Sequence, residues 1–322
     1  MSGLSATTQS FSFTISMDVV NGPLNLQETI LSGQTGEPEW LRAASIFTDV
    51  TLLDGTPIKY MLSHKGETDK FSLEVRAIPG NPRNQGDEIA TNLKTHLIDV
   101  LGLKDDLNLF YRKFAEDKVL SLTFQNLRGL RLMHGTNLFQ ALICSMLSQN
   151  NSVRLWNRSA RLMMASYGPR ANFVDGSREF LFPHPETLAK LNSRDLRSKT
   201  SMGYRAKPIV AVSRMIANHQ LDISKLANQS YDEAKDMLLE LPGVGPKVAD
   251  CFLLYGAGRR DAAPVDVWIH RIVSKRYLHG RKTSRAKTAA FLRKRFREWT
   301  GYAQLYLFDY ARREKVKRTG TQ

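Results

Sequence analysis

The sequence predicts an α+β protein, in which an N-terminal antiparallel β-sheet domain is followed by two mainly α-helical lobes with a helix-hairpin-helix motif. Near the N-terminus, Phe11, Phe13 and Ile15 alternate with polar residues, which is the period-two pattern of a half-buried strand. After the proline- and glycine-rich residues 79–86, apolar residues instead recur at helical spacing. The periodicity therefore changes from strands to helices at this point.

The predicted β-rich domain spans residues 1–115, and the helical region spans residues 116–322. Further strands are expected near residues 46–53, 58–62 and 71–75. The segment Ser32 to Gln34 has the composition of a turn. Helices are expected near residues 89–101, 104–117, 136–150, 152–167, 185–194, 204–218, 230–241, 247–257, 266–277, 285–298 and 301–316.

The helix-hairpin-helix motif is predicted near residues 230–257. Ser230 and Glu233 have the spacing of a capping box, which satisfies unpaired N–H groups at a helix start. The following hairpin contains Gly243 and Gly245, which can adopt positive φ and let backbone N–H groups approach a ligand oxygen closely. The hairpin is a candidate phosphate-binding turn, although a simple tight turn between two helices has the same composition.

Lys247 follows Pro246 in the first turn of the second helix of the motif. The positive end of the helix dipole and partial desolvation both disfavour a charged ammonium at this position, and a neutral amine is a nucleophile. Asp266 is expected to cap the next helix and to face Lys247. Taken alone, Asp266 is equally well explained as a structural helix cap.

The composition points to a polyanionic partner. The net charge is +15 and the isoelectric point is about 9.9. Nucleic acid is the first candidate for such a basic chain. An anionic membrane surface is the alternative, but the sequence has no apolar run long enough to span a bilayer. We therefore expect no membrane association.

The two cysteines, Cys144 and Cys251, are too few for a four-thiolate iron–sulfur cluster and do not have the spacing of a zinc motif. We therefore expect no metal and no cofactor. The first residues have neither a basic segment nor an apolar segment of a secretory signal, which predicts an intracellular protein.

Residues 241–251, followed by residues 263–267, resemble the helix-hairpin-helix DNA glycosylases, and most closely the 8-oxoguanine DNA glycosylases. The resemblance extends over residues 130–312 and, more faintly, to residues 32–34. It implies that a DNA-binding cleft lies between the two helical lobes. The number of cysteines excludes the iron–sulfur members of the superfamily that are related to endonuclease III.

This resemblance implies the roles of the catalytic residues. In the family, the lysine that matches Lys247 attacks the C1′ atom of the sugar, and the aspartate that matches Asp266 stabilises the developing charge. The hairpin residues Gly243, Val244 and Gly245 match the turn that binds a DNA phosphate.

The junction after Ser148 matches a DNA-contacting segment of the family. Gln149, Asn150 and Asn151 match residues that fill the space left by an extruded base. Arg154 matches the arginine that reads the opposite cytosine. Without the family, this segment is explained as a capped helix junction. Gln149 departs from the pattern, because the family usually has asparagine at this position.

Two further residues match DNA contacts, and one departs from the family. Tyr204 matches a tyrosine that wedges beside the opposite base, and Arg205 matches an arginine that contacts it. Without the family, Tyr204 is an interfacial aromatic. Trp268 stands where well-known members have histidine, so that the role of the histidine does not transfer and core packing is the expected role.

The resemblance also implies a pocket for the extruded base. Gln304 matches the residue at the Watson–Crick edge, Phe308 stacks on one face of the base, and Cys251 lies on the other face. Gly33 matches a glycine whose carbonyl accepts a hydrogen bond from N7–H of the oxidised base. Without the family, the segment around Gln304 is explained as a buried amphipathic helix.

The expected function is therefore that of a bifunctional DNA glycosylase and AP lyase, which excises 8-oxoguanine opposite cytosine through a lysine Schiff base. The expected partner is double-stranded DNA that contains oxidised guanine, and the protein is expected to be a monomer. Two alternatives stay open: an alkylbase glycosylase of the 3-methyladenine type, which works without the lysine, and a non-catalytic DNA-binding protein.

Overall fold

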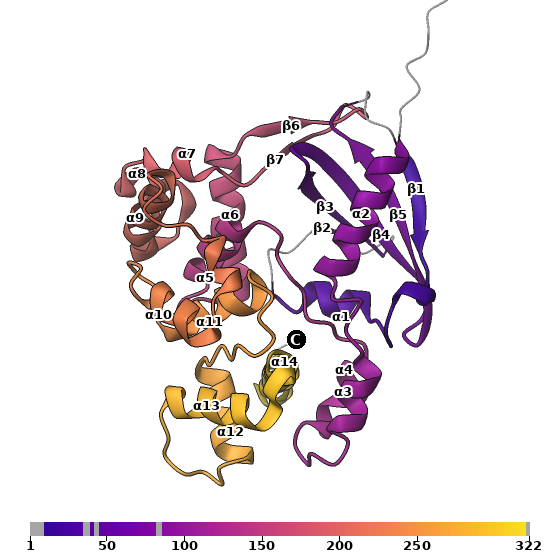
Figure 1. Cartoon of the computed structure of the whole chain (residues 1–322), viewed down its shortest axis with the longest axis vertical. Helices are drawn as coiled ribbons and strands as arrows, with labels where there is room; N and C mark the ends of the chain where they lie inside the picture. The colour runs from indigo at the N-terminus through magenta and orange to yellow at the C-terminus, as the bar shows by residue number, and fades with distance from the viewer. Residues whose placement is uncertain (1–9, 35–38, 42–44, 82–85, 320–322) are drawn as a thin grey trace, which may run out of the picture.

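A five-stranded antiparallel sheet forms the N-terminal part of the computed structural model, which describes residues 10–34, 39–41, 45–81 and 86–319 (Figure 1). Its strand order is β1-β5-β4-β3-β2. The strands are β1 Phe11–Ile15, β2 Glu39–Leu41, β3 Ile46–Leu53, β4 Thr56–Glu67 and β5 Lys70–Pro79. This confirms the predicted antiparallel sheet.

Helix α2, Gly86–Val100, covers one face of this sheet (Figure 1). Ile89, Leu93 and Leu97 lie one helical turn apart and pack into the same core as Leu73 of β5. The opposite side of the sheet contacts a two-stranded hairpin that the sequence did not predict, formed by β6 Arg170–Asn172 and β7 Arg178–Phe180. These strands have three residues each, which is too short for a periodic signal.

The rest of the described chain is mainly helical, as predicted. The α-helices are α1 Leu26–Leu31, α3 Leu107–Lys113, α4 Ser121–Leu127, α5 Leu138–Leu147, α6 Val153–Tyr167, α7 Pro185–Ala189, α8 Ser193–Thr200, α9 Ala206–Ala217, α10 Tyr231–Leu239, α11 Pro246–Tyr255, α12 Val267–Arg276, α13 Arg285–Phe296 and α14 Thr300–Thr319. The 3-10 helices are η1 Met17–Val19, η3 Gly203–Arg205, η4 Lys225–Asn228 and η5 Arg297–Trp299.

Three short helices were not predicted: α1, α4 and α8. Helix α1 has six residues inside the strand-rich region, and its start is fixed by the Asn25 side chain, which accepts a hydrogen bond from the Glu28 N–H at 3.0 Å. Helices this short owe their stability to tertiary packing rather than to a long apolar stripe. They therefore leave little signal in the sequence.

Two hydrophobic cores organise the chain. The first joins the sheet to α2, and the second begins with Leu107 and Phe110 of α3 and extends through the later helices to α14. Helix α4 packs against α14 although the two are far apart in sequence (Figure 1).

The division into domains at residue 115 stays a prediction. Within the described part of the chain, no helix combines the length and the apolar character needed to cross a membrane.

Arg131 connects the two cores from a fully buried position. Its guanidinium donates hydrogen bonds to backbone carbonyl oxygens of two separate loops: Asn21 at 2.8 Å, Gly22 at 3.0 Å, Pro23 at 2.9 Å, Gly102 at 2.7 Å and Asp105 at 3.1 Å. The rigid fork of donors on arginine suits this arrangement of acceptors. The segment that follows Arg131 leads into α5, so this network sets how the N-terminal domain meets the helices.

We expect Arg131→Met to lower the free energy of unfolding by at least about 3 kcal/mol, because several buried carbonyl groups lose their donor. Urea denaturation measures this loss. The matched control is Arg128→Met, which removes an exposed ion pair with Asp69 and should cost less than about 1 kcal/mol. Equal losses in the two variants would contradict a special role for Arg131.

Candidate active site

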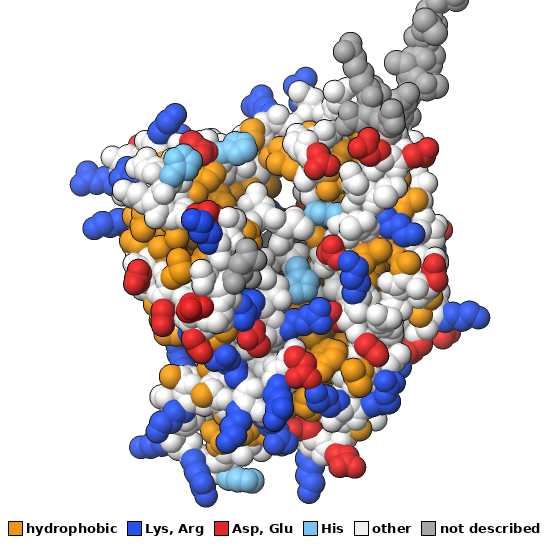
Figure 2. All heavy atoms as spheres, viewed as in Figure 1, with side chains coloured by type: hydrophobic (Ala, Val, Ile, Leu, Met, Phe, Trp, Pro, Cys, Tyr) orange, Lys and Arg blue, Asp and Glu red, His pale blue; other side chains and the backbone are white. Residues whose placement is uncertain are grey.

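A cleft of about 1820 Å³ brings together residues from the N-terminal domain and from both ends of the helical region. Figure 2 shows a hollow between the N-terminal domain and the helices, and it shows Lys and Arg side chains gathered below it, over the region of α12 to α14. Ten of the predicted site residues line the cleft: Gly33, Gln149, Asn150, Asn151, Gly245, Lys247, Cys251, Asp266, Gln304 and Phe308. Five lie outside its lining: Arg154, Tyr204, Arg205, Gly243 and Val244.

The helix-hairpin-helix motif is present as predicted, with α10 and α11 as its helices. Ser230 and Glu233 form the capping box, and each satisfies an N–H group of the other. Gly243 has φ +77, and a Cβ atom there would lie 2.6 Å from Cβ of Pro208, so both its conformation and its packing require glycine. Val244 is buried, whereas a Cβ on Gly245 would meet nothing within 4 Å. The open side of the hairpin is therefore at Gly245, at the N-terminus of α11.

Lys247 reaches from α11 to the C-terminal end of α5. Its Nζ donates to Ser148 Oγ at 2.7 Å, and Ser148 Oγ donates in turn to the Ser145 carbonyl at 2.7 Å. Cys251 lies one turn further along α11 and is buried. Burial raises the pKa of the Cys251 thiol, and the nearby charge of Lys247 opposes this shift. The cysteine is therefore a neutral thiol beside the amine.

Asp266 is the N-cap of α12, as predicted. Its Oδ1 atom accepts hydrogen bonds from the N–H groups of Trp268 and Ile269, both at 2.9 Å. Capping uses only one carboxylate oxygen, and Asp266 lines the same cleft as Lys247 and Cys251.

Arg205 holds the backbone of the loop that follows α5. Its guanidinium donates to the carbonyl groups of Gln149 at 3.0 Å, Asn150 at 3.3 Å and Met202 at 3.2 Å. Asn150 has φ +47, an uncommon conformation for a residue other than glycine. Arg205 is therefore a positioning residue for the loop, and its contact with a base stays a prediction.

Polar side chains of this loop and of its neighbours η3 and α6 lie close together. Tyr204 is 56% exposed, and its hydroxyl donates to Gln149 Oε1 at 3.1 Å. Asn151 Nδ2 donates to the Leu147 carbonyl at 3.1 Å, which fixes the end of α5. Arg154 is exposed in the first turn of α6. The loop therefore carries polar side chains on a backbone that Arg205 fixes by hydrogen bonds.

The amide of Gln304 is buried and lies in the predicted base pocket. Gln304 is 4% exposed and its Nε2 donates to the Pro264 carbonyl at 3.2 Å. Because a carbonyl only accepts, this bond fixes the orientation of the amide. Gln304 Oε1 is buried and has no hydrogen-bond partner among the described residues. A buried acceptor of this kind costs about 1–3 kcal/mol, and it is matched by a ligand that donates a hydrogen bond.

Arg312 connects Phe308 to the segment that contains Gly33. The Arg312 guanidinium lies 5.6 Å from the centre of the Phe308 ring and donates to the Ser32 carbonyl at 3.1 Å. Gly33 has φ +79, and a Cβ atom there would lie 2.6 Å from Val153 Cγ1. A methyl group added at Gly33 would therefore meet Val153 of α6, which lines the same cleft.

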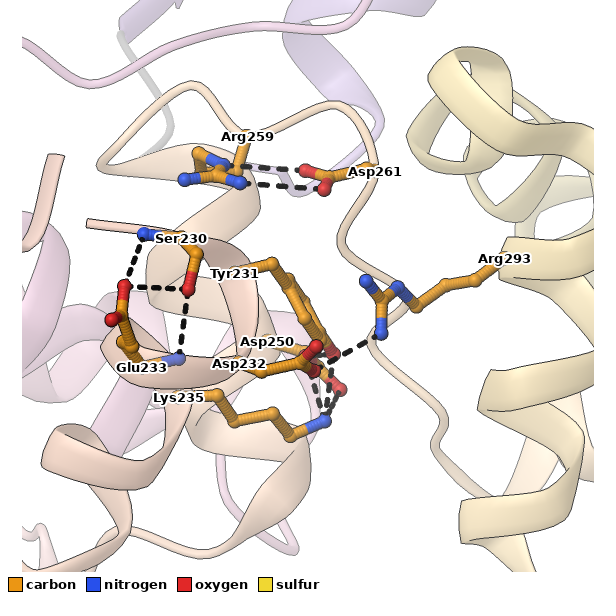
Figure 3. A network of polar contacts seen from close by, with 9 residues as sticks. All are labelled: Ser230, Tyr231, Asp232, Glu233, Lys235, Asp250, Arg259, Asp261 and Arg293. Atoms are coloured by element: carbon orange, nitrogen blue, oxygen red, sulfur yellow. Dashed lines mark hydrogen bonds and ion pairs between the residues drawn. The ribbon is translucent and has the colours of Figure 1, made fainter. Parts of the chain in front are cut away.

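Sequence patterns did not predict the roles of Ser148 and Arg312, nor the cluster of polar residues beside the motif that Figure 3 shows. Only Arg312 left a signal, since it is four residues after Phe308 and thus on the same side of α14. The partner of Lys247 is ninety-nine positions away in the sequence, which no local pattern shows. Among the described residues, no group of three or more His, Cys, Asp or Glu side chains is placed to hold a metal ion.

Comparison with known proteins identifies relatives of this arrangement. The family model of the HhH-GPD superfamily of base excision DNA repair proteins matches residues 143–298. A protein of Methanothermobacter thermautotrophicus with the name "Probable N-glycosylase/DNA lyase" is 35% identical over 317 residues, which cover 92% of this chain and 96% of that protein.

Solved structures share the whole fold. MBOgg1 in complex with a low-affinity DNA ligand has a TM-score of 0.78 at 26% identity, and the match covers 94% of this chain and 96% of that chain. The Clostridium acetobutylicum 8-oxoguanine glycosylase/lyase, in complex with double-stranded DNA containing cytosine opposite 8-oxoguanine, has a TM-score of 0.76 at 20% identity, with 92% and 94% covered. These matches confirm the predicted α+β architecture.

The two contributions of Asp266 can be separated by substitution. Asn caps helices as well as Asp does, so Asp266→Asn should leave the free energy of unfolding within about 0.5 kcal/mol of the wild type, whereas Asp266→Ala should lower it by about 1 kcal/mol. Urea denaturation of the three proteins measures both values. An equal loss in the two variants would show that the charge of Asp266, and not its cap, stabilises α12.

Proposed function

This chain belongs to the helix-hairpin-helix superfamily of base excision DNA repair proteins, and from this membership we propose that it is a bifunctional DNA glycosylase and AP lyase that excises 8-oxoguanine opposite cytosine. The observation that carries the proposal is the meeting of Lys247, Cys251 and Asp266 in one cleft, directly behind the open side of a glycine hairpin. We further propose that it acts inside the cell as a monomer on double-stranded DNA.

Binding begins with the phosphates. The N–H groups at Gly245 and the N-terminus of α11 favour an anion, and the net charge of +15 attracts DNA from a distance. Flipping a nucleotide out of the stack costs a few kcal/mol. The loop at Gln149 to Asn151 and the exposed ring of Tyr204 offset this cost by filling the space that the base leaves.

Excision follows from the position of Lys247. The neutral amine attacks C1′ of the flipped nucleotide, the bond from C1′ to the base nitrogen breaks, and the base leaves with that electron pair and takes up a proton. The C1′–O4′ bond then breaks, O4′ takes up a proton while the attached nitrogen loses one, and an imine between Lys247 and C1′ results. β-Elimination removes a proton from C2′ and breaks the bond from C3′ to oxygen, so that the 3′-phosphate leaves and the strand is cut. Ser148 holds the amine within the cleft before the reaction.

Asp266 acts on the charge that develops during this step. As the bond to the base breaks, the sugar gains positive charge, and a fixed carboxylate stabilises that state more than it stabilises the bound substrate. The two capping hydrogen bonds hold the carboxylate in place, so that no reorganisation is needed at the moment of reaction.

Recognition of the base rests on Gln304 and Gly33. The Watson–Crick edge of a guanine-type base carries N–H donors, which match the unpaired Gln304 Oε1 atom. Oxidised guanine also has an N7–H donor where guanine has an acceptor, and we propose that the Gly33 carbonyl distinguishes them. One gained hydrogen bond is worth about 1 kcal/mol, and two opposed acceptors cost about 1–3 kcal/mol. Phe308 and Cys251 are proposed to contact the two faces of the base.

The two alternatives are less well supported. A glycosylase of the 3-methyladenine type uses water and needs no amine at position 247, but Lys247 is hydrogen-bonded in the cleft. A protein that only binds DNA needs neither the buried acceptor on Gln304 nor the carboxylate of Asp266 in the cleft.

We predict that borohydride traps a covalent adduct between the wild-type protein and a duplex containing 8-oxoguanine, and that Lys247→Gln forms none, because the amide cannot form an imine. Denaturing gels measure the adduct. Lys275→Gln, which changes an exposed lysine on α12, is the control and should form the adduct as the wild type does. An undiminished yield of adduct with Lys247→Gln would refute the assignment of Lys247 as the nucleophile.

We predict that Gln304→Leu lowers 8-oxoguanine excision by roughly 10- to 100-fold, since the N–H donors of the base lose their buried acceptor. Cleavage at a preformed abasic site needs no base, so it should stay within about threefold of the wild type. Single-turnover assays on the two substrates measure both rates. A parallel loss of both would show that Gln304 supports the fold and does not read the base.

A further inference from the structure

Four side chains form a polar cluster where α10, α11 and α13 meet, on one wall of the cleft (Figure 3). Lys235 Nζ contacts both oxygens of the Asp250 carboxylate, at 2.9 and 3.0 Å, and the Tyr231 hydroxyl at 2.7 Å. The Tyr231 hydroxyl donates to Asp250 Oδ1 at 2.5 Å. Arg293 places its guanidinium 3.5 Å from the centre of the Tyr231 ring. We call these residues the α10–α11–α13 cluster.

The cluster is poorly explained by stability alone. The side chain of Asp250 is 3% exposed and that of Lys235 is 18% exposed, and burial raises the pKa of Asp250 while Lys235 opposes the shift. Desolvating two charges cancels much of the attraction between them, so a buried ion pair adds little net stability compared with apolar residues of the same size. What a satisfied network of this kind does provide is a fixed geometry between the elements that it joins.

Arg293 joins the two sides of the catalytic cleft. Figure 3 shows it extending from α13 toward Tyr231 and Asp232 on α10, and its Nη1 lies 3.5 Å from Asp232 Oδ1. On its own helix, Thr288 Oγ1 lies 2.9 Å from His270 Nδ1 of α12. Helix α12 begins at the cap formed by Asp266. These contacts connect the helix pair that carries Lys247 to the helix that Asp266 caps.

We propose that Arg293 is a positioning residue, which sets the separation of Lys247 and Asp266 by holding α13 against the α10–α11 hairpin. The role in catalysis rests on the proposed function, and the contact itself does not. The C-terminal end of α11 is already fixed, since the Gly135 N–H donates to the Tyr255 carbonyl at 2.6 Å, and the segment that follows the helix is held by the Gly301 N–H, which donates to the Arg260 carbonyl at 2.7 Å. Arg293 contacts Tyr231, whose hydroxyl donates to Asp250, three residues after Lys247 on α11.

The rival explanation is a direct contact between Arg293 and DNA. The side chain lines the cleft, and its buried Nε has no hydrogen-bond partner among the described residues. A phosphate contact would act without Tyr231 and would contribute to the salt dependence of binding. A positioning contact acts through Tyr231 and contributes nothing to that dependence.

A double-mutant cycle separates the two explanations. Arg293→Met, Tyr231→Leu and the double variant are compared with the wild type in single-turnover excision at saturating protein. We expect Arg293→Met to slow excision by roughly 2- to 30-fold, the range of a desolvated cation–π contact, and to have less than about a twofold effect when Tyr231 is already Leu. Independent effects of equal size in both backgrounds would overturn the proposal.

Two further measurements keep the test decisive if Tyr231→Leu does not fold. The dependence of log Kd on log salt should keep the wild-type slope in Arg293→Met, and a slope smaller by about one would assign Arg293 to a phosphate. Hydrogen exchange of the amides at the start of α11 should become faster in Arg293→Met and stay unchanged in Lys294→Met, which alters an exposed neighbour on the same helix. Unchanged exchange in Arg293→Met would overturn the proposal.

Hydrogen exchange needs no catalytic activity. A wild-type protein that forms no adduct with lesion DNA would therefore refute the proposed function, while the contact between Arg293 and Tyr231 would still be tested by the exchange rates. An active wild type with additive effects in the cycle would instead refute only the role of Arg293.

Discussion

The hydrogen bond between Lys247 Nζ and Ser148 Oγ is the interaction around which the site is arranged. It joins the helix-hairpin-helix motif to the end of α5, where the loop that we propose contacts DNA begins. The hydrogen-bond partner of the Lys247 amine is a hydroxyl rather than a carboxylate. The Asp266 carboxylate is instead held by the two N–H groups that it caps.

Much of the site was predictable because its parts are local in sequence. The capping box, the glycine hairpin and the N-cap at Asp266 each depend on residues within one helical turn, and the structure confirms all three. The short helix α1 and the β6–β7 hairpin were missed, because their few residues are stabilised by packing against other parts of the chain.

The contacts that the sequence did not reveal share another property, which is that they join distant segments through long side chains. The Arg205 guanidinium binds the backbone of a loop more than fifty residues earlier, and the predicted contact with a base does not reveal this role. Arg131 and Arg293 likewise act between elements. Arginine is common on the surface of any basic protein, so its presence alone does not distinguish a structural role from a role in DNA binding.

The buried Oε1 atom of Gln304, which has no partner among the described residues, sets a free-energy cost before any base is bound. The free energy cost of removing this acceptor from water is incurred during folding, before any DNA is bound. The site is thus preorganised: a base with a donor in the right place restores the lost hydrogen bond, and a base without one gains nothing for entering. Under the proposed function, discrimination is in this sense stored in the fold itself, as a small and permanent loss of the protein's own stability.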